Sequence, residues 1–320
     1  MTETSMYDLI IIGGGPAGLT AGIYAMRAAL KAVLIEKGLA GGQVANSDSV
    51  ENYPGFEYIT GFDLSQKFLN HAKSYGIEIV QEEVVEIQPG LDHHSVKLAN
   101  GKLLNAHALI LGMGGSPLKL GIPGEDKYYG KGVSYCATCD GFFFKNRTVV
   151  VVGGGDTAME EALYLAKLCK QVYIAHRRDA FRASRILQQR VLGECKIQVL
   201  WNTVLTEIKA NEEGVCAVQL KDTQTGESRE LATDGVFVFV GFAPNNQLVP
   251  AGIAMDGNGY VVVDEKCATK IPGIYVVGDL RQKYARQIVI AAADGCTAAL
   301  AAAHFVEEKK AAADTCALPE

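Results

Sequence analysis

Two cysteines two residues apart are the clearest chemical feature of the sequence. Cys136 and Cys139 are separated by two residues, and an acid, Asp140, directly follows the second thiol. The other cysteines are scattered, at positions 169, 195, 216, 267, 296 and 316. Scattered cysteines in a reducing compartment usually behave as small buried apolar side chains. The close pair therefore predicts redox chemistry in this stretch.

A zinc site is the first rival explanation for the Cys-x-x-Cys spacing. Structural zinc needs four ligands. The sequence offers neither a second Cys-x-x-Cys nor a pair of closely spaced histidines. We therefore expect no metal site.

A glycine turn follows the cysteine pair within a few residues. The apolar run Thr148–Val152 leads into Gly153–Ala158 and then into a helical stretch, Met159–Leu168. The same pattern opens the chain, where Tyr7–Ile12 leads into Gly13–Gly18. In a Gly-x-Gly-x-x-Gly turn between a strand and a helix, the glycines let a pyrophosphate approach the backbone at the helix N-terminus. Two such units predict two dinucleotide sites.

The residues that follow the next strand differ between the two units. After Ala32–Ile35 comes Glu36, where a carboxylate is expected to hold a ribose hydroxyl. After Val172–Ala175 come basic residues instead: His176, Arg177 and Arg178, with Arg182 shortly after them. Guanidinium groups bind a 2′-phosphate in bidentate fashion, whereas an acid would repel it. The second dinucleotide is therefore predicted to be NADPH, with a solvated basic face as the alternative.

Composition narrows the class of protein. The chain has 320 residues, 48% hydrophobic and 21% charged, and a net charge of -6. This balance suggests neither a nucleic-acid partner nor an anionic membrane partner. We find no apolar run long enough for a membrane span and no basic leader at the N-terminus, so we expect a cytoplasmic protein.

Proline and glycine clusters suggest two domain boundaries, one near Gly112–Gly124 and one near Gly241–Asn245. Between the glycine units we expect an amphipathic helix at 62–75, a strand at 77–87, and a hairpin of 95–98 with 103–111. Beyond the second unit we expect a β-meander of 197–199, 204–210, 215–221 and 230–231. Buried strands follow at 235–240, 259–263 and 273–279, then a helix from 287 to 306 and a frayed tail from 309.

The motifs, in this order and spacing, resemble the low-molecular-weight, bacterial-type thioredoxin reductases over nearly the whole chain. The shared stretches are Gly13–Gly18, Gly41-Gly42-Gln43, Val50-Glu51-Asn52, Cys136–Gly141, Gly153–Ala158, Glu160–Leu165, His176–Ala183, Gly278-Asp279 and Arg286-Gln287. One stretch departs from the family pattern: Gly112-Met113-Gly114-Gly115 stands where the family usually has Ala-Thr-Gly-Ala. Met113 is expected to be a packing residue.

The resemblance implies an α/β fold with two Rossmann-like three-layer (ββα) dinucleotide-binding domains. An FAD domain would comprise residues 1–116 and 246–320, and an NADPH domain, 117–245, would be inserted into it and carry the cysteine pair. In this family the two domains rotate relative to each other. The family also implies a homodimer that reduces thioredoxin.

The resemblance also implies specific site residues. Those expected to bind FAD are Gly13, Gly15, Pro16, Ala17, Gly18, Glu36, Gly42, Gln43, Asn52, Gly278, Asp279, Arg286, Gln287 and Ile288. Those expected to bind NADPH are Gly153, Gly155, Asp156, Thr157, His176, Arg177, Arg178 and Arg182. The N-terminus of the last helix, near Gln287 and Ile288, is expected to stabilise negative charge on the reduced flavin.

The family chemistry assigns roles to the redox residues. Cys139 would lie nearer the flavin, Cys136 would attack the thioredoxin disulfide, and Asp140 would be the general acid and base. Phe142, Phe143 and Lys131 are candidates for docking thioredoxin, with ordinary packing or solvation as the alternative. Three other functions are alternatives. The basic cluster after residue 175 argues against an oxygen-using dithiol oxidase, and the complete Cys-x-x-Cys-Asp argues against a non-catalytic redox sensor. The third is a reductase of another dithiol protein, such as a peroxiredoxin.

Overall fold

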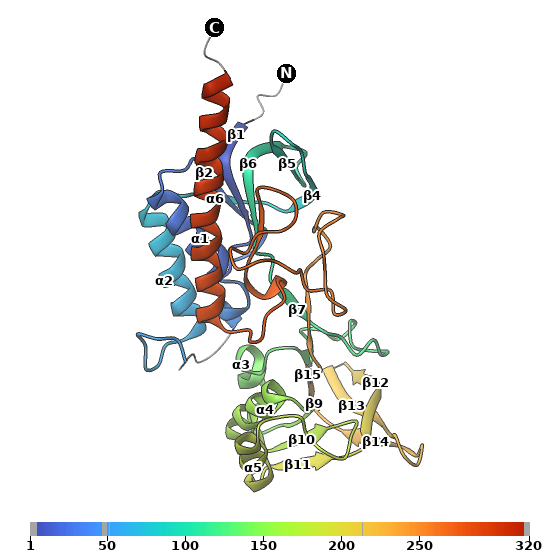
Figure 1. Cartoon of the computed structure of the whole chain (residues 1–320). Coiled ribbons are helices and arrows are strands. Elements are labelled where there is room, and N and C mark those ends of the chain that lie inside the picture. The colour runs from blue at the N-terminus through green and yellow to red at the C-terminus, as the bar shows by residue number, and fades with distance from the viewer. Residues whose placement is uncertain (1–4, 47–49, 51, 213, 317–320) are drawn as a thin grey trace. The chain divides into compact units, whose positions relative to one another are not determined.

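The computed structural model describes residues 5–46, 50, 52–212 and 214–316 (Figure 1). The chain divides into two compact units. Unit 1 comprises Met1–Ser116 and Ala243–Glu320, and unit 2, Pro117–Phe242, lies between those segments in the sequence. The sequence-based boundary at residue 245 falls close to the end of unit 2.

Unit 1 is built on a seven-stranded sheet. The strand order is β3-β2-β1-β6-β5-β4, and β17 also pairs with β6. The strands are β1 (Ser5–Ile12), β2 (Ala32–Glu36), β3 (Glu78–Gln81), β4 (Val84–Gln88), β5 (His94–Leu98), β6 (Leu103–Leu111) and β17 (Ile274–Val276). β1, β2, β3, β6 and β17 pair in parallel, whereas β4, β5 and β6 pair in antiparallel fashion.

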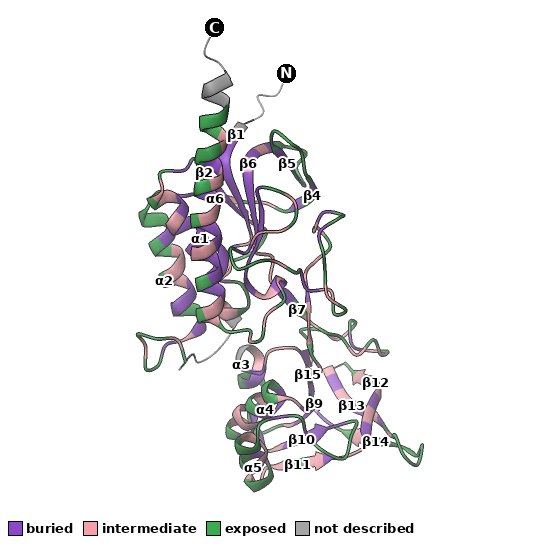
Figure 2. Cartoon of the chain, in the orientation of Figure 1, coloured by how far each residue is buried: buried purple, intermediate pink, exposed green. Residues whose placement is uncertain are grey.

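Both faces of the unit 1 sheet are covered, which explains why β1 is an apolar run without alternation. Leu9 and Ile11 pack against α1 (Pro16–Arg27) and α6 (Ile288–Cys316) on one face. Ile10 and Ile12 pack on the opposite face against the hairpin strands and the segment before β17. Figure 1 shows α1, α2 (Gly61–Ser74) and α6 on the same side of the sheet, and Figure 2 shows the buried strands behind them.

Unit 2 has three layers. A five-stranded parallel sheet has the order β11-β10-β9-β15-β8. Its strands are β8 (Val133–Ser134), β9 (Thr148–Gly153), β10 (Gln171–Ala175), β11 (Ile197–Leu200) and β15 (Gly235–Phe239). The helices α3 (Ala137–Asp140), α4 (Asp156–Leu168) and α5 (Arg185–Gly193) and the antiparallel strands β12 (Thr203–Asn211), β13 (Gly214–Asp222) and β14 (Ser228–Ala232) make up the rest. Val149 and Val151 pack with the helices, and Val150 and Val152 with the antiparallel sheet.

The chain segments that connect the two units pair with each other. β7 (Gly115–Pro117) and β16 (Phe242–Pro244) form a two-stranded sheet. It is flanked by backbone hydrogen bonds from Leu118 N–H to the Gly241 carbonyl and from Asn245 N–H to the Gly114 carbonyl, both 3.0 Å. Met113, at the departure from the family pattern, packs against the core of unit 1 as expected.

Several sequence-based assignments are wrong in detail. The run 197–199 is not part of the meander, because β11 pairs in parallel with β10. The run 259–263 forms no strand: Val261 makes only isolated bridges, to Met255 and Arg281. The expected strand 77–87 is two strands, β3 and β4. The sequence reading also missed α5.

The last helix differs most from its prediction. α6 continues to Cys316, so the tail expected to fray from residue 309 is helical up to that point; residues 317–320 lie outside the described part. The stretch Ile288–Ala312 is long and apolar enough to cross a membrane by length and composition, which the sequence reading did not recognise. Ala298, Ala299, Ala302 and Val306 lie in the core with α1, as in the core helix of a globular unit.

Candidate active site

The first glycine turn leaves room for a phosphate at the start of α1. Gly13 has φ +105°, and a Cβ there would overlap the Gly112 carbonyl, so no side chain fits. Gly15 is the N-cap of α1, no side chain caps the helix, and its first turn holds no acid. A Cβ on Gly15 would meet only the Gly42 Cα, at 4.0 Å. The helix N-terminus is thus left open for an anion.

Glu36 closes one side of this turn. The Gly14 N–H donates to Oε2 of Glu36 at 2.6 Å, and the Gly38 N–H donates to Oε1 at 2.8 Å. The carboxylate that ends β2 is therefore fixed beside the glycines by two backbone donors. Each oxygen keeps a lone pair for a further donor such as a ribose hydroxyl.

The other residues expected at this site come from distant parts of unit 1. Asn52 Nδ2 donates to Oε1 of Gln287 at 3.1 Å, so these two side chains meet just before α6. Gln43 Nε2 donates to the Gly115 carbonyl at 3.3 Å. The guanidinium of Arg286 instead lies over the ring of Tyr260, with Cζ 3.9 Å from the ring centroid.

Asp279 supplies a buried acceptor. It follows β17 in the short 3-10 turn Gly278–Leu280, and Gly278 takes φ +66°. Its Oδ1 is buried and has no hydrogen-bond partner among the described residues. An orphaned carboxylate oxygen and an open helix N-terminus together fit a dinucleotide that carries both hydroxyls and phosphates.

The second glycine turn, in unit 2, is also open, although the first turn of α4 holds an acid, Asp156. Gly155 is the N-cap of α4 without a side-chain cap, and a Cβ there would meet nothing within 4 Å. The loop after β10 is tied to this turn by two hydrogen bonds. Arg182 N–H donates to the Gly154 carbonyl at 2.8 Å, and Ser184 N–H donates to Oδ1 of Asp156 at 2.6 Å. Asp156 is thus already engaged with a backbone donor, and Thr157 lies beside it in the first turn of α4.

The basic residues of the β10 loop divide into two kinds. His176 is buried, with its Nε2 3.0 Å from the Ala180 carbonyl and its ring against Phe181 and Trp201. Its ring also occupies the space beside Gly154. We therefore interpret His176 as support for the glycine turn.

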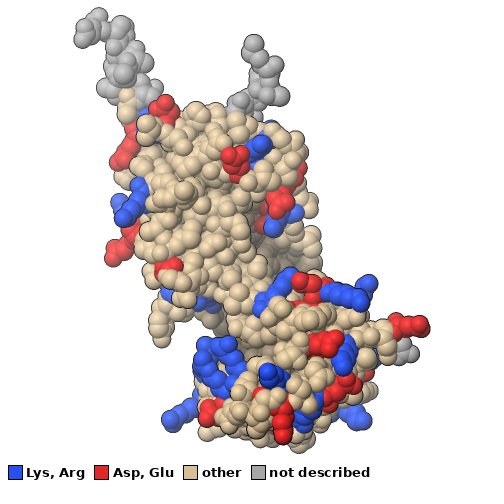
Figure 3. All heavy atoms as spheres, turned by 90° about the vertical axis from the view of Figure 1, so that its right-hand side faces the viewer, with Lys and Arg blue, Asp and Glu red and all other residues tan. Residues whose placement is uncertain are grey.

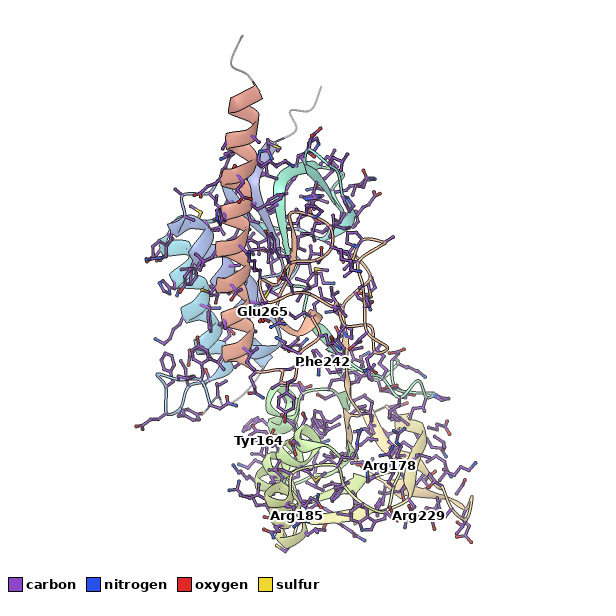
Figure 4. The ribbon with its side chains drawn as sticks, in the orientation of Figure 1. Tyr164, Arg178, Arg185, Arg229, Phe242 and Glu265 are labelled. Atoms are coloured by element: carbon purple, nitrogen blue, oxygen red, sulfur yellow. The ribbon has the colours of Figure 1, made fainter. Side chains whose placement is uncertain are left out.

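The three arginines of this loop, Arg177, Arg178 and Arg182, are exposed. No carboxylate of the described residues forms an ion pair with them. Figure 4 labels Arg178 on the loop after β10, and Figure 3 shows basic and acidic side chains interspersed over unit 2. The arginines are thus available to an anion.

Cys136 is disulfide-bonded and half-buried at the start of α3. The side chain of Cys139 lies outside the described part of the structure, although its backbone belongs to α3. Asp140, at the end of that helix, is half-buried, and its N–H donates to the Cys136 carbonyl at 3.3 Å. Phe142 and Phe143 follow directly and are 68% and 72% exposed, an unusual state for aromatic side chains.

Two residues that the sequence reading missed brace the cysteine turn. Ser134, which is buried, accepts the Cys136 N–H and donates to the Cys136 carbonyl through the same Oγ, at 3.0 Å each. Glu161 on α4 accepts the Ala137 N–H at 3.1 Å through Oε2. Ser134 lies two residues before the pair, a local signal that was available. Glu161 belongs to the stretch Glu160–Leu165 that resembles the family, but that stretch does not indicate a contact with the cysteine turn, because the contact depends on how α4 packs.

Comparison with known proteins agrees with this arrangement. Residues 7–295 match the family model described as pyridine nucleotide-disulphide oxidoreductase. A thioredoxin reductase of Bacillus subtilis is 46% identical over 96% of this chain and 97% of its own length. One of Helicobacter pylori is 44% identical over 94% and 99%.

The fold agrees as well. A crystal structure of Lactococcus lactis thioredoxin reductase has a TM-score of 0.88 and 43% identity over 94% of this chain and 99% of that one. These matches span both units and both glycine turns. The chain belongs to the pyridine nucleotide-disulphide oxidoreductase family and, within it, to the thioredoxin reductases.

Proposed function

We propose that this chain is an NADPH-dependent thioredoxin-disulfide reductase that uses FAD and the pair Cys136 and Cys139. The observation that carries the proposal is the disulfide-bonded Cys136, located in the same unit as an open glycine turn and three exposed arginines. A second open glycine turn in unit 1 supplies the other dinucleotide site. The disulfide partner in this proposal is Cys139.

Unit 1 is the proposed FAD domain. The N-terminus of α1 would receive the pyrophosphate, Glu36 the adenosine ribose, and Asp279 a hydroxyl of the cofactor. The start of α6, where Asn52 meets Gln287, presents backbone N–H groups beside Ile288 that favour negative charge. When bound, FAD supplies a two-electron relay between nicotinamide and disulfide.

Unit 2 is the proposed NADPH domain. The N-terminus of α4 would receive the pyrophosphate at Gly153–Thr157, and Arg177, Arg178 and Arg182 the 2′-phosphate. The hydrogen bonds of Arg182 and Ser184 to the glycine turn would hold the two phosphate-binding loops in a fixed relation. This geometry favours a phosphorylated dinucleotide over NADH.

The cysteine pair would pass two electrons to thioredoxin. Reduction of the Cys136–Cys139 disulfide takes two electrons and two protons, and Asp140 would hold and move one of those protons. The Cys136 thiolate would then attack the thioredoxin disulfide, and Cys139 would resolve the mixed disulfide, which re-forms the pair and releases reduced thioredoxin. Ser134 and Glu161 would keep the turn in place through this cycle.

Thioredoxin is the proposed partner, and the exposed Phe142 and Phe143 are the proposed docking residues, with Lys131 near them in sequence. Paired exposed aromatics on one short turn form the kind of apolar anchor that protein partners use. A homodimer and a cytoplasmic location complete the proposal.

A coupled assay tests the proposal. The purified protein should show a flavin spectrum, bleach with NADPH, and transfer electrons to thioredoxin and then to a disulfide reporter. The Cys136→Ser variant should keep the bleaching and lose thioredoxin reduction, whereas the exposed-thiol control Cys195→Ser should keep both. Oxygen-dependent turnover without thioredoxin would favour a dithiol oxidase. Bleaching with NADPH that neither thioredoxin nor another disulfide substrate reverses would favour a sensor.

A further inference from the structure

Four charged side chains lie together at the end of β17 and the start of α6. They are Asp279, Arg281, Lys283 and Asp294, here called the Asp294 cluster. Asp294 and Lys283 have side chains only 4% and 5% exposed. The cluster holds two positive and two negative charges. Figure 1 shows α6, which carries Asp294, alongside α1.

Asp294 is surrounded by donors. Arg281 binds it in bidentate fashion: Nη2 donates to Oδ1 at 2.6 Å, and Nε donates to Oδ2 at 2.9 Å. Lys283 Nζ donates to Oδ2 at 3.1 Å, and the Gly278 N–H donates to the same oxygen at 3.1 Å. One carboxylate on α6 thus holds three residues of the segment 278–283. This carboxylate is engaged within the protein and is not a candidate for direct ligand contact.

Asp279 is in the opposite situation. Its Oδ1 lies 3.4 Å from Lys283 Nζ, close enough for an ion pair, but accepts no hydrogen bond among the described residues. Lys283 therefore contacts two carboxylates: Asp294, which accepts several hydrogen bonds, and Asp279, whose Oδ1 accepts none among the described residues. Because Lys283 contacts both carboxylates, Asp294 can influence the orientation of the Asp279 side chain through this lysine.

The cluster also lies against the first dinucleotide turn. A Cβ on Gly278 would sit 3.2 Å from the Cβ of Ala17, in the first turn of α1. Gly295, the residue after Asp294, lies so close to the Ala17 carbonyl that a Cβ there would overlap it. The segment that Asp294 holds is therefore part of the wall of the proposed FAD site.

Stability alone gives a weak reason for such a cluster. Burying the charges of Asp294 and Lys283, with Arg281 and Asp279 partly buried beside them, costs desolvation free energy that their attraction only partly returns, and apolar packing of similar volume is often as stable. A positioning role explains the arrangement better, because each bond fixes the backbone or side chain of a residue at the site.

We propose that Asp294 is a positioning residue of the flavin site. Through Gly278 and Lys283 it holds Asp279 with Oδ1 turned inward beside Lys283, so that the exposed part of this carboxylate stays available to the cofactor. This inference rests on the proposed function, since it requires that unit 1 binds FAD. Asp294 itself touches no cofactor atom in this proposal.

The test is a double-mutant cycle on FAD affinity, measured by fluorescence titration of the flavin-free protein. Asp294→Asn should raise the Kd for FAD about 10- to 100-fold, the range that positioning residues around other sites show. In an Asp279→Asn background the same change should have little further effect on the Kd, because Asp294 acts on the cofactor through the Asp279 carboxylate, which this variant lacks. The matched control Asp264→Asn, which removes a carboxylate bonded to two backbone N–H groups elsewhere in unit 1, should leave the Kd unchanged.

Lys283→Met keeps the hydrogen bonds between Arg281 and Asp294 and removes the ion pair with Asp279. It is the alternative test variant if Asp294→Asn fails to fold. It should raise the Kd to a similar extent, and Lys283→Arg should restore most of the affinity. An unchanged Kd in the single variants, or an effect of equal size in the wild-type and Asp279→Asn backgrounds, would overturn the proposal. A wild-type chain that binds no FAD would instead refute the proposed function on which it rests.

Discussion

The carboxylate of Glu161 accepts a hydrogen bond from the backbone N–H of Ala137, between the two cysteines of the redox turn. Ala137 is fully buried, so its N–H has no access to water as a substitute partner. An unsatisfied buried donor costs about 1–3 kcal/mol. This bond therefore fixes the turn to α4, the helix that begins at the second glycine turn.

Removing this acceptor should impair the thiol steps and spare the flavin steps. Glu161→Ala is expected to lower the rate of thioredoxin reduction about tenfold, because the turn loses its anchor while unit 1 is unchanged. Rapid-mixing measurements should find that flavin reduction by NADPH keeps its rate. Glu161→Gln retains an acceptor oxygen and should behave nearly like the wild type. A slower flavin reduction in Glu161→Ala would contradict the prediction that this residue acts only on the thiol steps.

The features predicted correctly from sequence are those encoded by neighbouring residues. Gly13 and Gly153 take positive φ angles that side chains avoid, so their turns could be identified without any tertiary information. Glu36 lies beside the glycines, because its distance from them follows from the length of the helix between them, whereas its contact with a ribose stays a prediction.

The features that were missed depend on long-range packing. The apolar run of β11 looks the same whether it joins a meander or lies beside β10, and only the sheet decides. Asp294 and Lys283 lie in a helix and a loop whose contact follows from the packing of α6 on α1. Neither residue has a local pattern that marks it.

The buried thiols should be inert. Burial raises the pKa of Cys169 and of Cys267 to about 11 in each case. At pH 8 only about one molecule in a thousand would carry either thiolate, and the thiolate is the reactive form. Iodoacetamide should therefore label the exposed Cys195 in the native protein and leave these two unlabelled, as peptide mass spectrometry can show. All three should react in urea; rapid native labelling of Cys267 would contradict its burial.

Stability should decrease in mild acid because of His94. Burial lowers the pKa of His94, with Lys309, His93 and His107 adding to the effect and the Pro272 carbonyl opposing it. Its Nδ1 accepts the Gly90 N–H, which needs the neutral ring, whereas the bond from Nε2 to the Pro272 carbonyl, 3.1 Å long, can form in either protonation state.

The unfolded chain binds the proton more readily than the folded one, so folding stability falls as pH falls below about 6.5. Each tenfold difference in proton affinity contributes about 1.4 kcal/mol. Thermal unfolding of the flavin-free protein between pH 5 and 8 should show this slope, and His94→Gln should flatten it. The exposed neighbour provides the control, since His93→Gln should leave most of the slope. An unaltered slope in His94→Gln would assign the pH dependence to other groups.

The arginines of the β10 loop should decide which nicotinamide dinucleotide is used. Arg177 and Arg178 are exposed and make no ion pair with a described carboxylate, so their charge is available to a 2′-phosphate. A hydrogen bond to a charged group contributes about 1.5–3 kcal/mol. The Arg177→Ala, Arg178→Ala double variant should raise the KM for NADPH at least about tenfold and change the KM for NADH less than about threefold. The control is Arg190→Ala, which replaces an exposed arginine on α5 and should change neither KM. If the double variant raised the KM equally for both dinucleotides, the loop would not recognise the 2′-phosphate.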